Sequence, residues 1–589
     1  MDQQKIRNVA IIAHVDHGKT TLVDQFFSQS GMFRKNQEVT KRLMDSMDLE
    51  RERGITIASK NGSFTYHDYH INIIDTPGHA DFGGQVERVL RMADGALLLV
   101  DAQEGPMPQT YFVLKKALAL SLPIIVVINK IDKPAARPDW AVDQVFDLFV
   151  KLHAPDHILD FPVTYASAKD GWATDDLHVA SETVEPLFKA IVKHIPAPAG
   201  DPSAPLQLLV SSIDYSPYLG RLGIGKITGG TMNINRDMAV AMRDGSIIPA
   251  RVTKIFRFET NQKVPTNQAV AGEIVAVAGM NEVTVGVTYT DPADPRPLPP
   301  IEIDPPTLSM NFIPNDSPFA GTEGEFVTSR HLEERLQREI LSDVALRVEN
   351  LEGAIGYKVS GRGELHLSIL IERMRREGYE FQVTRPQVIL REENGRLLEP
   401  YEELTINVDE QYVGPVMEKL GQRKGRLNHM ETDNGMTTLV FTIPTRGLLG
   451  FRSQFMTDSR GMGIMNYIFS QYGPHVGEIK NRKNGALIAK ENCETVSYAL
   501  FNLQERGKMF LGPGVKVYAG QIVGEHSRDN DLTVNPAKSK KLTNMRAAGS
   551  DDNILLIPPA EMSLEDCIVY INDDELVEIT PKAIRLRKR

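Results

Sequence analysis

A turn near the start of the chain is the feature that most constrains the fold. Residues 13–20 read Ala-His-Val-Asp-His-Gly-Lys-Thr and follow the apolar run 8–12. An apolar strand, a tight turn and a helix that opens at Lys19, Thr20 and Thr21 are typical of a phosphate-binding loop. There, backbone N–H groups and the helix N-terminus face phosphate oxygens. The Lys19 ammonium would reach the β- and γ-phosphates, and the Thr20 hydroxyl would hold Mg²⁺.

Two further motifs predict the rest of the phosphate and metal site. The apolar run 71–74 ends in Asp75-Thr76-Pro77-Gly78-His79. An acidic residue at the carboxyl end of a parallel strand can hold Mg²⁺ through water, and the Gly78 N–H can approach the γ-phosphate. Thr56, in the polar stretch Arg-Gly-Ile-Thr-Ile at 53–57, is placed to meet Mg²⁺ and the γ-phosphate. The predicted metal ligands are therefore Thr20, Thr56 and Asp75.

Two more motifs predict which base is bound. Asn129-Lys130-Ile131-Asp132 follows the apolar run 123–128. The Asp132 carboxylate can accept from both N–H groups on the Watson–Crick edge of guanine, whereas adenine would leave it mispaired. A backbone N–H of Ser167-Ala168-Lys169 would meet guanine O6 and close the pocket. Five motifs in this order predict GTP binding. The predicted GTP-binding residues are Asp16, His17, Gly18, Lys19, Thr20, Thr21, Gly78, Asn129, Lys130, Asp132, Ser167, Ala168 and Lys169.

His79 is the candidate catalytic residue. Phosphoryl transfer to water needs a positioned water and compensation of developing charge, and an imidazole can orient that water near neutral pH. Val15 and Ile55 are candidates for an apolar gate that holds His79 away until a partner engages. The alternative is that His79 is a solvated switch residue without a chemical role. Because no arginine is obviously placed to act in cis, we expect slow intrinsic turnover and acceleration by a partner of up to about 10⁵-fold.

Composition restricts the compartment and the kind of partner. The two cysteines, Cys493 and Cys567, leave no disulfide framework, and the N-terminus has no apolar signal core. The longest apolar runs have the length of strands rather than of membrane spans, so a cytoplasmic protein without membrane contact is expected. We also expect a monomer. The net charge of −11 argues against a surface coated in basic residues for non-specific nucleic-acid binding.

Three local basic clusters stand against this acidic background. Each is either a nucleic-acid contact or a solvated charged face. The clusters are Arg373, Arg375 and Arg376; then Lys538, Lys540, Lys541 and Arg546; and finally Lys582, Arg585, Arg587, Lys588 and Arg589.

The length of 589 residues suggests about four or five domains. Apolar runs that alternate with helical stretches predict a mostly parallel sheet covered by helices on both faces, and short β-rich runs with Gly, Asp and Asn turns predict a barrel. The expected fold is multidomain. It comprises an α/β P-loop GTPase domain (1–199), a β-barrel domain (203–298), two α+β, ferredoxin-like domains (304–385 and 398–480) and a mixed, β-rich C-terminal domain (481–589).

Two segments in the second half carry more specific expectations. The periodicity predicts a helix over 365–376 with Leu365, Ile369 and Met374 near one face and with Glu372 and the arginines away from it. The polar segment 529–552 has few apolar anchors, and a loop of that length is usually functional or disordered. We expect it to be mobile in the free protein.

At this point the motifs resemble those of translational GTPases, and elongation factor G in particular. The similarity rests on AHVDHGKTT, RERGITI, DTPGHADF and NKID, and it continues through the barrel. Residues 360–367, Ser-Gly-Arg-Gly-Glu-Leu-His-Leu, resemble the third domain of that factor, and Glu-Pro-Tyr-Glu at 399–402 begins a segment similar to its fifth. Only residues 386–398 lie between them, so the fourth domain is missing, which disfavours a translocase.

Two families of relatives lack that domain, LepA and BipA (also called TypA), and the segment 530–547 resembles BipA. This resemblance implies a ribosome-associated GTPase that binds the elongation-factor site of the large subunit. It would act in large-subunit assembly and in translation under cold or nutrient stress, and guanosine tetraphosphate would occupy its nucleotide pocket as a regulator. Contacts to ribosomal RNA or to the end of a tRNA are expected from Lys538, Lys540, Lys541, Asn544 and Arg546.

Two other functions remain open at this stage. One is a LepA-like elongation or back-translocation factor. The other is a non-catalytic, nucleotide-switched assembly factor that binds RNA. His79 favours an enzyme over a passive switch, and the tail favours the BipA family over LepA.

Overall fold

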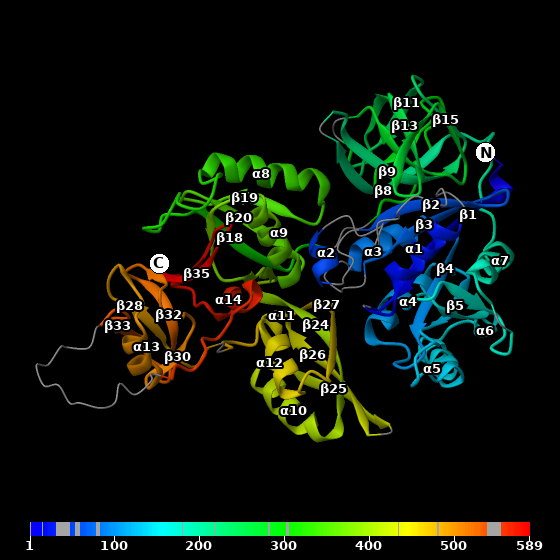
Figure 1. Ribbon diagram of the computed structural model, residues 1–589. Coiled ribbons are helices and arrows are strands. Elements are labelled where there is room, and N and C mark those ends of the chain that lie inside the picture. Colours follow the sequence, from blue (N-terminus) through cyan, green and yellow to red (C-terminus); the bar gives the residue numbers. More distant parts are fainter. Residues whose placement is uncertain are drawn as a thin grey trace, which may run out of the picture. The chain divides into compact units, whose positions relative to one another are not determined.

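A computed structural model gives the structure of the chain (Figure 1). It describes residues 2–14, 16–30, 48–53, 59–77, 83–179, 181–216, 218–280, 283–301, 305–433, 435–479, 482–538 and 555–589. The chain forms two compact units. Residues 1–304 and 341–344 make up the first, and residues 305–340 and 345–589 make up the second.

The first unit begins with a seven-stranded sheet of order β2-β3-β1-β4-β5-β6-β7. Its five central strands run parallel, and β2 and β7 pair antiparallel at the two edges. Strands β1, β4 and β5 are buried along their whole length, as expected of strands that are covered on both faces. The strands are β1 (Ile6–Ala13), β2 (Lys60–Tyr66), β3 (Tyr69–Asp75), β4 (Gly95–Asp101), β5 (Ile124–Asn129), β6 (Val163–Ser167) and β7 (Trp172–Thr174).

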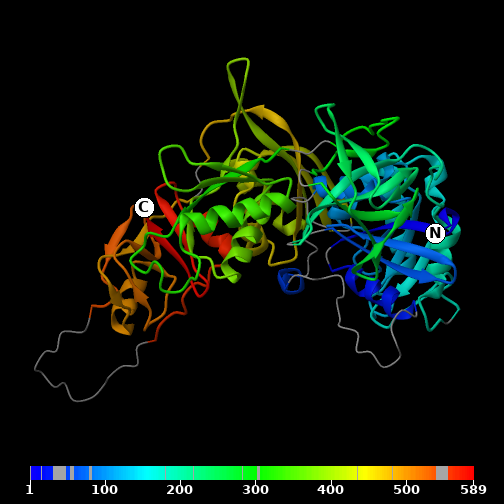
Figure 2. The same cartoon turned by 90° about the horizontal axis from the view of Figure 1, so that it is seen from above.

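Helices cover both faces of this sheet, as the sequence predicted. The helices α1 (Lys19–Gln29) and α7 (Glu185–His194) contribute Phe26 and Ile191 to the core on one face. On the other face α3 (Gly83–Leu90), α4 (Pro108–Ala119) and α5 (Pro138–Lys151) pack against Leu98 and Val126. The blue and cyan ribbons of Figure 2 show this layered part from above. The remaining helices of this part are η1 (Gln3–Lys5), α2 (Asp48–Arg53) and α6 (Asp156–Leu159).

An antiparallel barrel completes the first unit. Its eight-stranded sheet has the order β12-β11-β17-β8-β9-β16-β13-β14, and β10 pairs with β15 beside it. The interior is filled by apolar side chains such as Val240, Val275 and Tyr289. The strands are β8 (Gln207–Ser216), β9 (Gly220–Gly229), β10 (Thr231–Asn233), β11 (Asp237–Ala241), β12 (Ile247–Arg251), β13 (Lys254–Glu259), β14 (Gln262–Thr266), β15 (Gln268–Val270), β16 (Ile274–Ala278) and β17 (Thr288–Thr290).

Three hydrogen bonds join the barrel and the α/β part through Asn8, Asp94 and Lys226. The side-chain amide of Asn8, which is fully buried, donates to Gly272 O at 2.9 Å and to Asp94 Oδ2 at 2.7 Å. Lys226 of the barrel donates to the other Asp94 oxygen at 2.9 Å. The buried Asn8 amide is therefore hydrogen-bonded to both parts, as buried polar groups normally are.

The second unit is built on one long sheet that joins distant parts of the chain. Its order is β19-β20-β18-β21-β34-β35-β32-β28-β33, with β22 on β18 and β30 on β32. Strand β21 pairs with β34, so Phe381 lies opposite Ile579. The strands are β18 (Leu308–Pro314), β19 (Arg347–Asn350), β20 (Tyr357–Gly361), β21 (Phe381–Val383), β22 (Gln387–Val388), β28 (Ala486–Ala489), β30 (Gly507–Met509), β32 (Gln521–His526), β33 (Leu532–Val534), β34 (Glu575–Ile579) and β35 (Ile584–Lys588).

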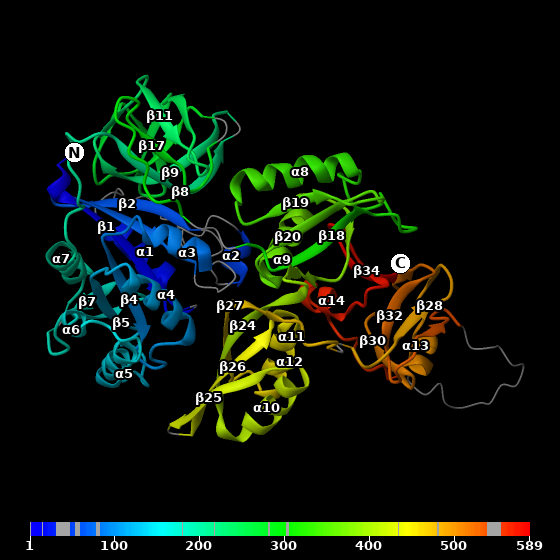
Figure 3. The ribbon, with the colours of Figure 1, turned by 180° about the vertical axis from the view of Figure 1, so that it is seen from behind.

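The last two strands therefore connect the third and fifth predicted segments. Figure 3 shows β34 among the strands of the 308–383 segment and β32 in the C-terminal segment. Helices α8 (Ser329–Ser342), α9 (Glu364–Arg376), α13 (Ser497–Gln504) and α14 (Leu564–Tyr570) accompany this sheet, and β29 (Cys493–Glu494) pairs with β31 (Lys516–Val517).

Residues 391–474 form a second, five-stranded antiparallel sheet, β23-β24-β26-β25 with β27 on β24. Leu404, Phe441 and Phe455 belong to the core between this sheet and its helices. The elements are β23 (Arg391–Glu393), β24 (Arg396–Asp409), η3 (Glu410–Tyr412), α10 (Val413–Gln422), β25 (Arg426–Asp433), β26 (Met436–Pro444), α11 (Thr445–Leu448), α12 (Phe451–Asp458) and β27 (Ile464–Pro474).

Helix α9 confirms the predicted helix but corrects the prediction for one of its faces. Glu372 is buried at 6% exposure rather than turned away from the core. Its carboxylate accepts from Arg375 at 2.7 and 2.9 Å and from Arg376 at 2.7 Å. Burial raises the pKa of Glu372, but the two guanidinium groups lower it by more. The pKa is therefore below its usual value, and the side chain is held as a carboxylate. A buried charge is tolerated here because it is paired.

The basic clusters at 373–376 and 582–589 are largely engaged within the protein. Arg373 binds Glu339 at 2.8 Å, and Arg585 binds Glu578 at 3.1 Å and Glu323 at 2.5 Å. Lys588 lies within 2.6–2.9 Å of three carboxylates, those of Asp531, Asp574 and Glu575. The paired residues of these clusters therefore form ion pairs that join parts of the folded protein.

The first residues of the polar segment 529–552 include a strand, which corrects the expectation for them. Leu532–Val534 form β33 and pair in parallel with β28, with Val534 buried in the core of the C-terminal segment. Leu532 and Val534 both pack in this core, so these two apolar side chains are enough to hold the strand. Residues 539–554 lie outside the described part of the chain.

Candidate functional site

The predicted phosphate loop lies between the end of β1 and the start of α1. Asp16 and Gly18 both have positive φ, at 65° and 93°, and α1 begins at Lys19. A Cβ on Gly18 would lie 2.4 Å from Nδ2 of Asn129, so a larger residue cannot occupy this position without moving Asn129. The turn is therefore tight enough to direct backbone N–H groups toward one point.

Lys19 and Asp75 meet where β1 and β3 end. The two strands are paired so that Ile11 lies opposite Asp75. The Lys19 ammonium lies 2.7 Å from Asp75 Oδ1 and donates to Thr76 O at 2.5 Å. Lys19 is 9% exposed and Asp75 is 2% exposed. Because the pair is shielded from water, its charges are felt strongly by a ligand that enters beside them.

The donor set at this point fits Mg²⁺. A hydroxyl at Thr20 in the first turn of α1 and the carboxylate of Asp75 are hard oxygen ligands, and Mg²⁺ commonly takes only one or two protein groups besides phosphate and water. No cluster of three or more His, Cys, Asp or Glu side chains suited to a metal occurs in the described part of the chain. Thr56, the third predicted ligand, lies outside the described residues.

Asn129 joins the phosphate loop to the predicted base loop. Its side-chain amide donates to His17 O at 2.8 Å, and its Oδ1 accepts from the Ala168 N–H at 3.0 Å. Asn129 is 1% exposed. One buried amide thus connects three of the five motifs, which explains why an asparagine is needed here. A guanine O6 directed at Ala168 would share or replace the bond that Asn129 makes to this N–H.

Lys130 binds within the protein, whereas Asp132 is exposed. Lys130 has a positive φ of 62°, and its ammonium lies 2.8 Å from Asp101 Oδ2. Burial raises the pKa of Asp101, but hydrogen bonds from Lys130 and from the Gln103 N–H lower it by more. The net pKa is below the usual value, so this carboxylate stays ionised. With its two first residues anchored, the loop leaves the Asp132 carboxylate open to a ligand.

The Ser-Ala-Lys turn is held by its own side chains. Ser167 is buried and donates to Asp170 Oδ2 at 2.8 Å, and its hydroxyl accepts from the Asp170 N–H at 3.3 Å. Lys169 is exposed at the rim. The turn is therefore stabilised by its own hydrogen bonds.

One of the predicted RNA-contact residues lies within the described part of the chain, and the others lie outside it. Lys538 is exposed at the end of the described segment 482–538. The gate, switch, catalytic and remaining RNA-contact candidates lie outside the described residues: Val15, Ile55, Thr56, Gly78, His79, Lys540, Lys541, Asn544 and Arg546.

Two acidic residues beside the site, Asp101 and Glu104, belong to none of the predicted motifs. Asp101 is fully buried at the end of β4 and pairs with Lys130, and Glu104 lies 3.5 Å from the buried His17 ring. Asp101 follows a buried parallel strand, as Asp75 does, so its position at a strand end was a usable signal.

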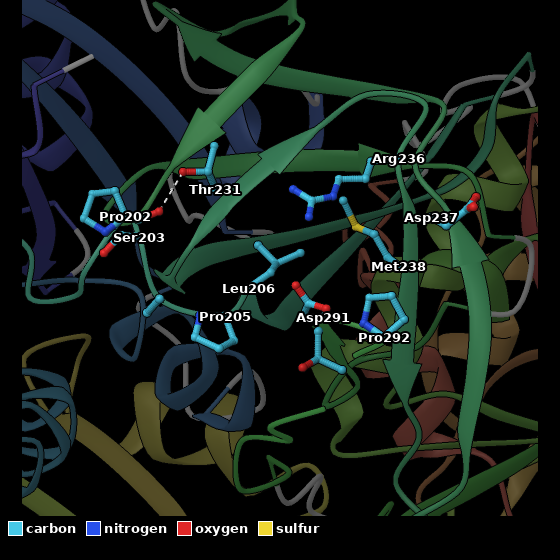
Figure 4. Close-up of a pocket in the computed structure, with 12 residues that line it drawn as sticks. Pro202, Ser203, Pro205, Leu206, Thr231, Arg236, Asp237, Met238, Asp291 and Pro292 are labelled. Atoms are coloured by element: carbon cyan, nitrogen blue, oxygen red, sulfur yellow. Dashed lines mark hydrogen bonds between the residues drawn. The ribbon is translucent and has the colours of Figure 1, made fainter. Parts of the chain in front are cut away.

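A separate pocket of about 290 Å³ opens at one end of the barrel (Figure 4). Pro202, Pro205 and Pro292 line it together with Arg236 and Asp291. It contains none of the predicted site residues. Because Asp237 joins Asp291 beside the one guanidinium, the pocket does not favour a phosphate group.

No helix in the described ranges is both long and apolar enough to cross a membrane.

Three family profiles match the chain. "Elongation factor Tu GTP binding domain" matches residues 4–197, "Elongation factor G C-terminus" matches 396–483, and "TypA/BipA C-terminal domain" matches 484–589. The chain is 54% identical to the "Large ribosomal subunit assembly factor BipA" of Salmonella typhimurium over 588 residues, which cover 100% of this chain and 97% of that one.

Proteins of the same name from other bacteria are equally similar. Identity is 55% to the Synechocystis protein, with 99% of this chain and 98% of that one covered. It is 50% to the Bacillus subtilis protein, with 99% and 96% covered. A crystal structure of a Thermus thermophilus protein superposes with a TM-score of 0.55 at 16% identity, covering 80% of this chain and 98% of that one, which supports the fold alone.

Proposed function

The chain belongs to the TypA/BipA family of translational GTPases, and we propose that it hydrolyses GTP to GDP and phosphate while assembling the large ribosomal subunit. Relatives at 50–55% identity over nearly the whole chain carry the name of a large-subunit assembly factor. The observation that carries the proposal is the buried amide of Asn129, which joins the phosphate loop to the base loop. This link holds the phosphate-binding and base-binding motifs together as one nucleotide site.

The residues divide the work as follows. Lys19 neutralises the β- and γ-phosphates, and the backbone of the 16–18 turn donates to their oxygens. A bound Mg²⁺, held by Thr20, Thr56 and Asp75, would supply further positive charge toward the phosphates. Asp132 selects guanine, and His79 orients the attacking water. Val15 and Ile55 keep His79 away from the phosphate until the ribosome engages.

Turnover measurements with and without ribosomes test this function. We expect slow hydrolysis by the free protein and stimulation by about 10³–10⁵-fold with ribosomes or large subunits. The assay is single-turnover release of phosphate from GTP, with small subunits alone as the control. Hydrolysis that is equally slow in the presence of every ribosomal particle would contradict the proposed function.

We further infer a cytoplasmic, monomeric protein whose pocket also accepts guanosine tetraphosphate, so that its work is tied to cold and nutrient stress. The guanine edge and the first phosphates of that alarmone are those of GDP, and the same residues would bind it. Competition of the alarmone against GDP, measured by calorimetry, checks this inference. Displacement by GTP but not by the alarmone would refute it.

Ribosome binding should depend on the basic residues that follow β33. Lys538, Lys540, Lys541 and Arg546 would contact phosphate oxygens of ribosomal RNA or of a tRNA end, with Asn544 hydrogen-bonding a base or sugar. Replacing the four basic residues by alanine should weaken ribosome binding and flatten its dependence on salt. Binding releases fewer counterions when fewer phosphate contacts form. Binding measured by sedimentation across a salt series gives both quantities.

A matched control removes the same charge elsewhere in the second unit. Lys424, Lys490, Lys508 and Lys516 are exposed, and their replacement by alanine should leave the salt slope close to that of the unaltered protein. GDP affinity should be unchanged in both variants. If the two variants lose the same affinity and slope, the segment has no specific role in binding.

A further inference from the structure

The side chain of His17 does not face the phosphate site but is fully buried within the α/β part. Its Nδ1 accepts from the backbone N–H of Asp101 at 3.3 Å, and its Nε2 lies 3.5 Å from Glu104 Oε2. A ring nitrogen that accepts carries no proton, so the proton of a neutral ring is on Nε2, the nitrogen that lies 3.5 Å from Glu104 Oε2. The neighbouring His17 ring also helps to hold the pKa of Glu104 below its usual range.

The turn that His17 contacts is itself bound to the base loop. Within this turn, residues 101–104, the Asp101 carboxylate lies 2.8 Å from the Lys130 ammonium, and the Ala102 N–H donates to Asn129 O at 2.8 Å. The backbone oxygen of His17 accepts from the Asn129 side chain. The phosphate loop is therefore tied to the base loop twice, through the His17 backbone and through the His17 ring.

We propose, on the basis of the proposed GTPase function, that His17 is a positioning residue that couples the phosphate loop to the base loop through the 101–104 turn. The ring fixes the turn, the turn fixes Lys130, and the loop that presents Asp132 is held in the geometry that suits a nucleotide bound at Lys19. Groups held in place before binding lose less conformational freedom when the ligand arrives. Loss of this link should weaken nucleotide binding although His17 itself makes no side-chain contact with the ligand.

A pair of near-isosteric substitutions separates the two ring nitrogens. In His17→Asn the amide oxygen lies near the position of Nδ1 and can still accept from Asp101. In His17→Gln the amide lies near the position of Nε2, so the contact to Glu104 is kept and the Asp101 N–H is left buried without an acceptor. We expect GDP affinity within about threefold of wild type for His17→Asn and at least about tenfold weaker for His17→Gln.

Fluorescence titration with a labelled GDP measures these affinities, with thermal unfolding of each variant as a check on folding. A role in packing alone would favour glutamine, which fills more of the volume of the ring. Equal losses for both variants, or a larger loss for asparagine, would overturn the proposal. The wild-type titration in the same series tests nucleotide binding itself, so failure of the proposed function is recognised separately.

A double-mutant cycle tests the route of the coupling. If His17 acts through Asp101 on Lys130, the loss of GDP affinity in His17→Gln combined with Lys130→Met should be smaller than the product of the two single losses. Independent contributions would multiply, and that result would contradict the route through the turn.

The tautomer of His17 provides a readout that needs no core variant. In ¹⁵N-histidine-labelled protein, the signal that shifts on Glu104→Gln is assigned to His17. We expect it to show a protonated Nε2 and an unprotonated Nδ1. A protonated Nδ1 would exclude the bond from Asp101 and refute the proposal even if the variants of His17 do not fold.

Discussion

Replacing His79 by alanine is expected to leave GTP affinity nearly unchanged and to lower ribosome-stimulated hydrolysis by about 10²-fold or more. That magnitude is typical of a group that orients or exchanges a proton with the attacking water. The affinity should persist because Lys19, Asp75 and Asn129 already form a connected site without His79. The measurement is single-turnover GTP hydrolysis at saturating ribosomes, beside an equilibrium titration with a non-hydrolysable analogue.

Glutamine at the same position is the matched control. A glutamine side chain can orient water, although it cannot carry an extra proton, so His79→Gln should retain more activity than His79→Ala. Its rate should also lose any dependence on pH that arises from the imidazole. Wild-type rates in His79→Ala would leave His79 as a solvated switch residue and place the catalytic function elsewhere.

The position of the described motifs at one edge of the sheet follows from the sequence, because these motifs lie at the ends of predicted strands. Residues 71–74 and 124–128 are mostly apolar, and the structure buries both within parallel strands of one sheet. Parallel strands bring their carboxyl ends to one edge. The proximity of motifs that are widely spaced in the chain, such as those at Asp75 and Asn129, can therefore be predicted without knowing any contact between distant residues.

The second unit was harder to predict because its sheet depends on contacts between distant residues. Nothing local in residues 575–579 indicates that they pair with 381–383, and this pairing turns the end of the chain into the centre of a sheet. The burial of Glu372 is equally unreadable from helical periodicity, because Arg375 and Arg376 offset its charge only in the folded geometry. Glu578, fully buried beside Arg585, repeats this pattern.

Replacing Asp132 by asparagine should change the preferred base from guanine to xanthine. Guanine presents two N–H donors to the carboxylate, whereas xanthine presents one donor and one carbonyl oxygen, which match the acceptor and the donor of an amide. Asparagine facing guanine leaves one hydrogen-bonding group mispaired. GTP binding should therefore weaken by about 10²–10³-fold, and xanthosine triphosphate should bind more tightly than GTP. Competition against labelled nucleotide measures both affinities.

The structure makes this substitution a clean test, because Asp132 is the exposed member of a loop whose other polar side chains are engaged. Asn129 is bound to His17 and Ala168, and Lys130 is bound to Asp101, so the change at 132 should leave the loop in place. Asp139→Asn, an exposed carboxylate in the first turn of α5, is the matched control and should keep the preference for GTP. If Asp132→Asn also keeps that preference, the base is recognised by another group, and the loop serves only to hold the phosphate turn.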